Sequence, residues 1–144
     1  MKWLSLALLV AIAACGGASP PVDWTWKLQK ENQITALWTQ IRGWRHDAHM
    51  DLEPTRPDVM AVSGQPLSLA RNVCTAEHEV PKTCEDICDL STAICDNAES
   101  ICGIAAELGA DDSWAQDKCA SAKASCREAK QRCCNCSKAP PEGT

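Results

Sequence analysis

The chain has 144 residues, eleven of them cysteine, and contains neither phenylalanine nor tyrosine. Its length suits one modest domain with appendages and is too short for a further enzyme-sized unit. The formal net charge of −5 argues against a nucleic-acid-binding protein, because such proteins cluster lysine and arginine against phosphates. A core without Phe or Tyr is thin, and the cysteine content is typical of a secreted scaffold whose disulfides supplement the core.

Residues 1–14 have the composition of an export signal. Lys2 precedes an uninterrupted stretch of apolar and small residues from Leu6 to Ala14. This stretch is too short to span a membrane as a mature helix, and it fits the apolar region of a signal peptide. We therefore expect residues 1–14 to be a signal peptide.

The end of this signal carries a second motif. In Ile12-Ala13-Ala14-Cys15, a branched aliphatic residue and two small residues precede a cysteine. The segment resembles the lipobox of bacterial lipoproteins, and the whole chain is similar to cysteine-rich lipoproteins of bacterial envelopes. The resemblance implies cleavage before Cys15, lipidation of the Cys15 thiol and acylation of the new amino terminus with chains such as palmitate. Several acyl chains form a stable membrane anchor where a single chain is marginal.

An ordinary secretory signal, cleaved after Ala13 or Ala14, is the alternative. Lipidation of Cys15 leaves ten cysteines, an even number that can pair completely, whereas ordinary cleavage leaves an odd thiol. Gly16 follows the cysteine, and no Asp stands there as in lipoproteins retained at the inner membrane. The resemblance therefore favours the outer membrane and leaves open whether the protein faces the periplasm or the outside.

Residues 15–26 are small and proline-containing at first, which suits a tether behind the anchor. Residues 27–49 are predicted to form an amphipathic helix, because apolar residues recur at three- and four-residue steps. These are Ile34, Leu37, Trp38, Ile41, Trp44 and Ala48. Residues 50–82 contain several prolines and no clear period, so we expect a linker that can drape over the helices.

Residues 83–137 are predicted to form two helices, and residues 138–144 a flexible tail. Thr83 is the expected cap of the first helix and Gly109 its stop, and Asp111 or Asp112 is the expected cap of the second. Helices joined by so few residues must return antiparallel. The predicted fold class is therefore all-α, with an antiparallel helical hairpin as its main unit.

Cysteines recur every seven residues in both helices of this hairpin. In an antiparallel hairpin, the sequence numbers of two facing residues add up to the same total for every facing pair. Three pairs of cysteines, each with one cysteine from either helix, share one total, and half of that total is a position in the predicted turn. Seven-residue steps also keep each set on one face of its helix. The spacing thus predicts three stacked disulfides: Cys102 with Cys119, Cys95 with Cys126, and Cys88 with Cys133.

Four further cysteines follow the anchor. Cys84 and Cys136 deviate from this register by one position and are within reach of each other at frayed helix ends. Their pairing leaves Cys74 for Cys134, and a bridge from Cys74 to Cys136 is the alternative.

An apolar stripe beside the cysteines of the first hairpin helix needs a cover. It consists of Ile87, Ile94, Ile101 and Leu108. The tryptophan-rich helix 27–49 is the candidate, which gives a three-helix arrangement. Residues 84–112 carry eight acidic side chains and no base, and residues 117–138 carry six bases against two acids. We therefore expect ion pairs between the two helices of the hairpin.

Binding of a soft metal is the alternative use of the cysteines. Cys84 and Cys88 share a helical face, and three cysteines cluster in residues 133–136, which suits Cu(I) or Zn(II). The pattern resembles copper-storage helical bundles only in its CxxxC pair, and mitochondrial twin-cysteine hairpins only in its ladder geometry. An oxidising envelope favours disulfides over thiolate ligands.

The three histidines do not indicate a metal or catalytic site. His46 and His49 have a spacing that can clasp a metal, but no acidic or cysteine ligand is fixed beside them, and His78 lies between two glutamates in an expected loop. No catalytic triad pattern, phosphate-binding loop or redox CxxC accompanies them.

We therefore expect no enzyme and no cofactor. The expected protein is a lipid-anchored component of the cell envelope with a structural or protein-interaction role. Its expected partners are the membrane and another envelope protein, rather than nucleic acid or a small-molecule substrate.

Overall fold

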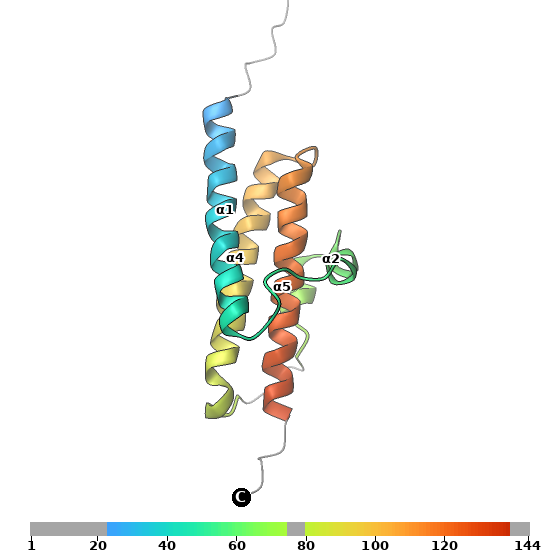
Figure 1. The fold of residues 1–144 in the computed structure, drawn as a ribbon. Helices are drawn as coiled ribbons and strands as arrows, with labels where there is room; N and C mark the ends of the chain where they lie inside the picture. The colour runs from blue at the N-terminus through green and yellow to red at the C-terminus, as the bar shows by residue number, and fades with distance from the viewer. Residues whose placement is uncertain (1–22, 75–79, 139–144) are drawn as a thin grey trace, which may run out of the picture.

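The computed structural model describes residues 23–74 and 80–138, and these residues are all-α, with no strand (Figure 1). The elements are α1 (Trp24–Asp47), α2 (Arg56–Val62), α3 (Leu67–Arg71), the 3-10 turn η1 (Lys82–Cys84), α4 (Glu85–Leu108) and α5 (Ser113–Lys138). Within this part of the chain, no helix is both long and apolar enough to cross a membrane. The expected signal peptide, Cys15 and residues 139–144 lie outside the described residues.

Helices α4 and α5 form the predicted antiparallel hairpin. Gly109 ends α4 with φ 97°, a left-handed conformation that a side chain would disfavour. Asp112 then caps α5, because its carboxylate accepts the backbone N–H of Ala115 at 3.0 Å. The turn residues thus act as predicted, and they bring the two cysteine stripes to face each other.

Helix α1 covers the apolar stripe of the hairpin and gives the three-helix arrangement. Its buried residues Ile34, Trp38 and Ile41 pack in one core with Ile94 and Ile101. Asn97 fixes the contact from α4, since its amide donates to the Leu37 carbonyl at 3.3 Å and to the Gln40 side chain at 2.9 Å. The core that positions everything else therefore lies between α1 and the two cysteine helices.

The start of α1 differs from the sequence prediction. The helix begins at Trp24, inside the expected tether 15–26, because the Asp23 carboxylate accepts the backbone N–H groups of Thr25 and Trp26. Helix α1 ends at Asp47, two residues before the predicted end at residue 49, and His49 has a φ of 55°.

The expected linker 50–82 contains regular structure. Thr55 caps α2 by accepting the Asp58 backbone N–H, and Pro57 occupies the first turn, where its missing N–H costs nothing. Both α2 and α3 pack on α5, burying Val62 and Ala70 (Figure 1). These helices are too short for a visible apolar period, which is why the sequence indicated only a linker.

The hairpin boundaries also differ slightly. Thr83 is not the cap of α4, because residues Lys82–Cys84 form the turn η1 and Cys84 occupies the cap position without a side-chain cap bond. Helix α5 ends at Lys138, one residue past the predicted hairpin 83–137. Disulfides at its last turns hold backbone that would otherwise fray.

The ion pairs are not those expected from the charges of the hairpin. Among the described residues, no ion pair joins α4 to α5; the acids of α4 instead meet bases of α1 and α3. Lys30 reaches Glu107 at 2.6 Å, and Arg71 reaches both Asp96 and Glu99. The stripes that face each other between α4 and α5 consist of cysteines and small residues, so the charged side chains of both helices lie on the flanks.

Asp112 supports a prediction on stability and pH. Its carboxylate also pairs with Lys27 at 2.8 Å, and the hydrogen bond from Lys27, with the Ala115 N–H, lowers the pKa of Asp112. We expect Asp112→Ala to lower the free energy of unfolding by about 1 kcal/mol, as for loss of a helix cap. A carboxylate with a lowered pKa stabilises the fold above the ordinary Asp pKa of about 3.9, and this contribution is lost as the pH falls through the lowered value.

Urea unfolding at neutral pH and at pH values below the ordinary Asp pKa measures this effect. The difference in the free energy of unfolding between wild type and Asp112→Ala is expected to be smaller in acid than at neutral pH. The neighbouring control Asp111→Ala is expected to have a free energy of unfolding close to that of the wild type at both pH values. An Asp112→Ala protein as stable as the control at neutral pH would contradict the role of the cap.

Candidate functional site: the disulfide ladder and its cleft

Three disulfides join α4 to α5 in a ladder, and they are the pairs that the seven-residue spacing predicts. Their Cα–Cα distances are 4.6 Å for Cys102–Cys119, 4.6 Å for Cys95–Cys126 and 4.8 Å for Cys88–Cys133. These distances lie in the range of about 4.4–6.8 Å that a disulfide allows between Cα atoms, and the residues beside the bridges are small. Those residues are all buried: Ser91, Ala98, Ala105, Ala115, Ala122 and Ala129.

Two more disulfides gather at the open end of the hairpin. Cys84 is joined to Cys136 with a Cα–Cα distance of 5.9 Å, and Cys74 to Cys134 with 5.6 Å. Of the alternatives that the sequence left open for Cys74, the structure has the bridge to Cys134. This bridge ties the segment after α3 to the end of α5.

The cysteines among the described residues are therefore all in disulfides, and in this oxidation state none of them offers a thiolate to a metal. Residues 23–74 and 80–138 contain no group of three or more His, Cys, Asp or Glu side chains placed to hold a metal ion. His46 is exposed and 3.6 Å from the Asp47 carboxylate, whereas His49 follows the helix in a left-handed conformation. The two do not share a helical face, and His78 lies outside the described residues.

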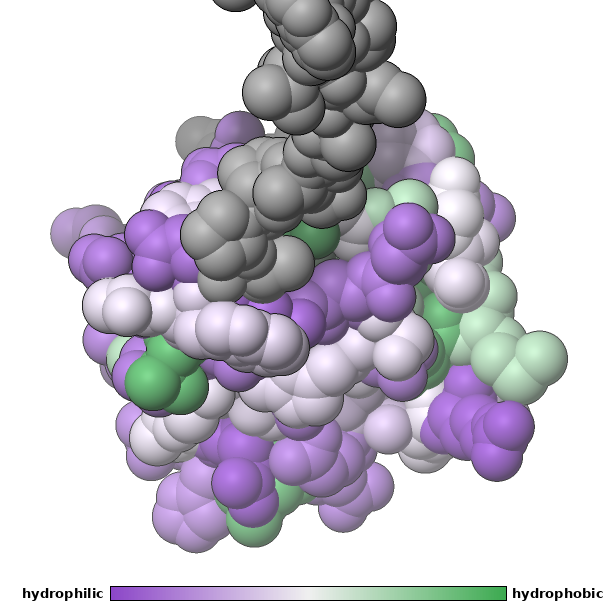
Figure 2. Space-filling model, turned by 90° about the horizontal axis from the view of Figure 1, so that it is seen from above, coloured by the Kyte–Doolittle hydropathy of each residue, from purple (hydrophilic) through white to green (hydrophobic). Residues whose placement is uncertain are grey.

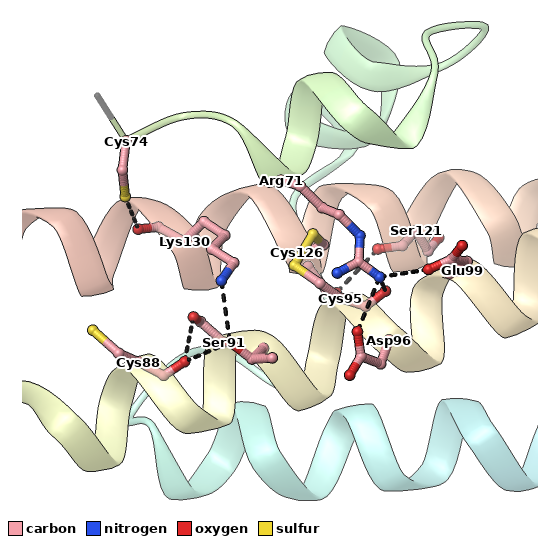
Figure 3. Close-up of a disulfide and its surroundings, with 12 residues drawn as sticks. Arg71, Cys74, Cys88, Ser91, Cys95, Asp96, Glu99, Ser121, Cys126 and Lys130 are labelled. Atoms are coloured by element: carbon pink, nitrogen blue, oxygen red, sulfur yellow. Dashed lines mark hydrogen bonds and ion pairs between the residues drawn. A yellow bond between two sulfur atoms is a disulfide. The ribbon is translucent and has the colours of Figure 1, made fainter. Parts of the chain in front are cut away.

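A half-open cleft of about 630 Å³ adjoins the ladder at this end. The disulfides of Cys74 and Cys88 line it, together with Arg71, Lys130 and Thr92. Figure 3 shows Arg71 reaching from α3 to α4, where its guanidinium Nη2 donates to Asp96 at 3.0 Å and to Glu99 at 2.7 Å. It also donates to the Cys95 carbonyl at 3.1 Å, so Arg71 anchors α3 directly over a bridge of the ladder.

Lys130 contributes a second positive charge to the cleft. Its Nζ donates to the Thr92 hydroxyl at 3.2 Å. Burial lowers the pKa of Lys130, and the nearby charge of Arg71 acts in the same direction. The lining offers amine, guanidinium, carboxylate and hydroxyl groups, but no histidine and no free thiol.

Arg45 is the buried charged residue that sequence reasoning missed. Its side chain on α1 is only 1% exposed, and its guanidinium pairs with Glu128 of α5 at 2.9 Å. It also donates to the Asp51 carbonyl at 2.6 Å and to the Ser125 hydroxyl at 3.2 Å. Its signal in the sequence was its position four residues after Ile41, on the apolar face of the helix. This network joins α1 to α5, so it serves the packing of the bundle.

Comparison with known proteins adds no functional assignment: no protein family, curated protein or solved structure was found that matches the chain. The interpretation of function therefore depends on the cysteines, the surface and the amino-terminal motif.

Proposed function

We propose that this is an exported, lipid-anchored protein of the bacterial cell envelope, in which a disulfide-stapled helical bundle has a structural or protein-interaction role. The observation that carries the proposal is the pairing of the cysteines. Ten of the eleven cysteines form five disulfides, and the eleventh is Cys15 of the lipobox-like segment. Cytosolic thiols are kept reduced, so five disulfides support an oxidising compartment.

The surroundings of Cys15 support the same location. A signal peptide delivers the chain to the envelope, and acylation at Cys15 holds it at the membrane. The absence of Asp after Cys15 favours the outer membrane. In this proposal the protein needs no cofactor, and its partners are the membrane and another envelope protein.

The geometry of the bundle supports a scaffold rather than a catalyst. Bridges span the hairpin from its turn to its open end, and a further bridge fixes the segment after α3. Such crosslinks hold a surface in one shape, which lowers the entropic cost of binding a partner. The cleft beside Arg71 and Lys130 has charged and hydroxyl groups that suit contact with a polar partner surface.

Replacement of the anchor cysteine tests the proposal. We expect Cys15→Ser to accumulate as uncleaved precursor or unanchored protein and to lose labelling by a palmitate analogue, because the acyl chains supply nearly all of the membrane affinity. Phase separation in detergent and the mass of the amino-terminal peptide measure the change. Inhibition of lipoprotein signal cleavage with a globomycin-type compound is expected to leave the same precursor in the wild type.

A matched control removes other cysteines without touching the anchor. Cys74→Ser combined with Cys134→Ser deletes one disulfide and is expected to stay in the detergent phase with its palmitate label. A Cys15→Ser protein that is cleaved and partitions like this control would show that Cys15 is not the anchor.

A further inference from the structure

Large apolar side chains are exposed together at one end of the bundle. They are Trp24, Trp26 and Leu28 of α1 and Trp114 of α5, and Trp24 is 73% exposed. The ion pair between Lys27 and Asp112 places the first turn of α1 beside the start of α5. In Figure 1 the start of α1 and the α4–α5 turn lie at this end, opposite the end of α5. We call these four residues the tryptophan end.

The composition of this end is unusual for a surface in water. Five tryptophans follow Cys15 in the sequence, and three of them are at this end, whereas Trp38 is buried and Trp44 half-buried in the bundle. Indole has an apolar ring with one polar N–H, and it is the side chain that gathers where a membrane meets water. Trp26 and Trp114 are 41% and 38% exposed, so each ring packs partly on the bundle and presents the rest of its surface to the surroundings.

The direction of the chain brings the same end toward the proposed anchor. Asp23 caps α1 at the tryptophan end, and it is eight positions after Cys15. Eight fully extended residues span at most about 29 Å. Helix α1 itself is about 36 Å long. An anchor at Cys15 therefore restricts the tryptophan end to the vicinity of the bilayer and leaves the open end of the hairpin free to point away.

The charges at this end indicate the kind of lipid surface. Lys27 pairs with Asp112, and Lys30 pairs with Glu107, so both lysines of the first turns of α1 already have acidic partners. Asp111 in the turn is exposed. Attraction to anionic lipids needs clustered, unpaired Lys or Arg near the surface. The contact is thus expected to form on zwitterionic lipid and not to strengthen with the anionic fraction.

Hydropathy at this end fits a shallow contact. Figure 2 looks onto the molecule from above and shows hydrophobic residues in small separate groups among hydrophilic ones, over the part that the grey atoms leave visible. A surface of this kind suits the headgroup region, where indole rings are accommodated, and not the hydrocarbon interior.

We propose that the tryptophan end is a membrane contact surface that seats Trp24, Trp26 and Trp114 in the headgroup region of a zwitterionic lipid surface. This inference rests on the proposed anchor at Cys15 and extends it by fixing the orientation of the bundle. The cleft beside Arg71, at the opposite half of the hairpin, then faces away from the membrane and toward a partner.

Quenching of tryptophan fluorescence by brominated lipid tests the contact. The mature lipoprotein is reconstituted into phosphatidylcholine vesicles with bromine near the top of the acyl chains, and into plain vesicles as reference. Flotation reports the anchor separately. We expect the wild type to float and to lose fluorescence in the brominated vesicles, to the same extent when a fraction of the lipid is replaced by phosphatidylglycerol.

Two triple variants make the test specific. Trp24→Gln, Trp26→Gln and Trp114→Gln together are expected to float but lose the quenching, because the two remaining tryptophans are inside the bundle. The control Leu52→Gln, Met60→Gln and Leu69→Gln removes the same number of exposed apolar residues elsewhere. It is expected to be quenched like the wild type, and the helical circular dichroism signal of both variants checks their folding.

Each other outcome overturns a defined part. A wild type that floats without quenching overturns the membrane contact and leaves the anchor intact. A wild type that does not float overturns the anchor and, with it, the orientation. A third outcome is a blue shift of the tryptophan emission that is equal in brominated and plain vesicles, together with a doubled mass of the protein in sedimentation. It identifies a second copy of the chain as the occupant of the tryptophan end and overturns the lipid contact.

Discussion

Reduction of the five disulfides is expected to abolish cooperative unfolding of the bundle while leaving fluctuating helix. The buried core consists mainly of Ala, Ile and Cys, so its apolar contribution to stability is small. The innermost bridge, Cys102–Cys119, has a sequence separation of 17 residues, and a loop of this size is worth roughly 3 kcal/mol in the chain-entropy model. The outer bridges add less than their separate values, because each loop is already shortened by the bridge inside it.

Thermal melting followed by circular dichroism, with and without reductant and in the presence of a chelator, measures this loss. Free-thiol titration of the untreated mature protein is the control and is expected to find no reactive thiol. Reoxidised protein is expected to recover the original transition. A reduced, metal-free protein that melts as sharply and at the same temperature as the oxidised one would show that the disulfides are not structural. Untreated protein with several free thiols that acquires stoichiometric Cu(I) or Zn(II) would instead favour metal binding.

The hairpin was predictable because its signals repeat. The cysteines of each helix recur every seven residues. A different register between the two helices would have left all three cysteine pairs unmatched, so the spacing allows one register. Gly109 and Asp112 are residue types that end and cap helices, so the turn between the two cysteine helices was also predictable. The cover by α1 followed from its apolar period. These features depend on local geometry and on one symmetric contact, which a sequence displays directly.

Features that depend on tertiary contact were not predictable in the same way. The short helices α2 and α3 exist because they pack on α5, and too few residues are involved for a period to emerge. The partners of Arg71 are on α4, about 25 residues away in the sequence. The tryptophan end depends on how far α1 extends beyond its apolar face and on where α5 begins, which are facts of packing.

The pairing of charged side chains was the part of the fold that the sequence predicted least well. Opposite net charges on the two hairpin helices indicated direct ion pairs, but the positions that face each other between them are taken by cysteines and small residues, and the acids of α4 pair with bases of α1 and α3 instead. Arginine is rarely buried, so composition alone gave no reason to place Arg45 in the core. A buried arginine needs acceptors, and those of Arg45 come from residues 51, 125 and 128.

Loss of the acidic partner of Arg45 is expected to be among the most destabilising single substitutions outside the cysteines. Glu128→Ala leaves a guanidinium that is 1% exposed without its counter-charge. Removing one member of a buried ion pair costs 3–5 kcal/mol, and we expect about 3 kcal/mol here because the Glu128 side chain is 31% exposed. Urea unfolding at neutral pH measures this difference.

Replacement of the whole pair separates the cost of an orphaned charge from the value of the contact. Arg45→Met combined with Glu128→Leu is expected to be more stable than Glu128→Ala alone, because apolar residues of similar volume need no counter-charge. The matched surface control is Glu53→Ala, which removes the acidic partner of Arg42, a residue on α1 like Arg45. Both side chains of the Arg42–Glu53 pair are about half exposed, so we expect the free energy of unfolding to fall by less than about 1 kcal/mol. If Glu128→Ala were no less stable than Glu53→Ala, solvent would have to reach the Arg45 guanidinium, and the packing of α1 against α5 would be looser than the structure has it.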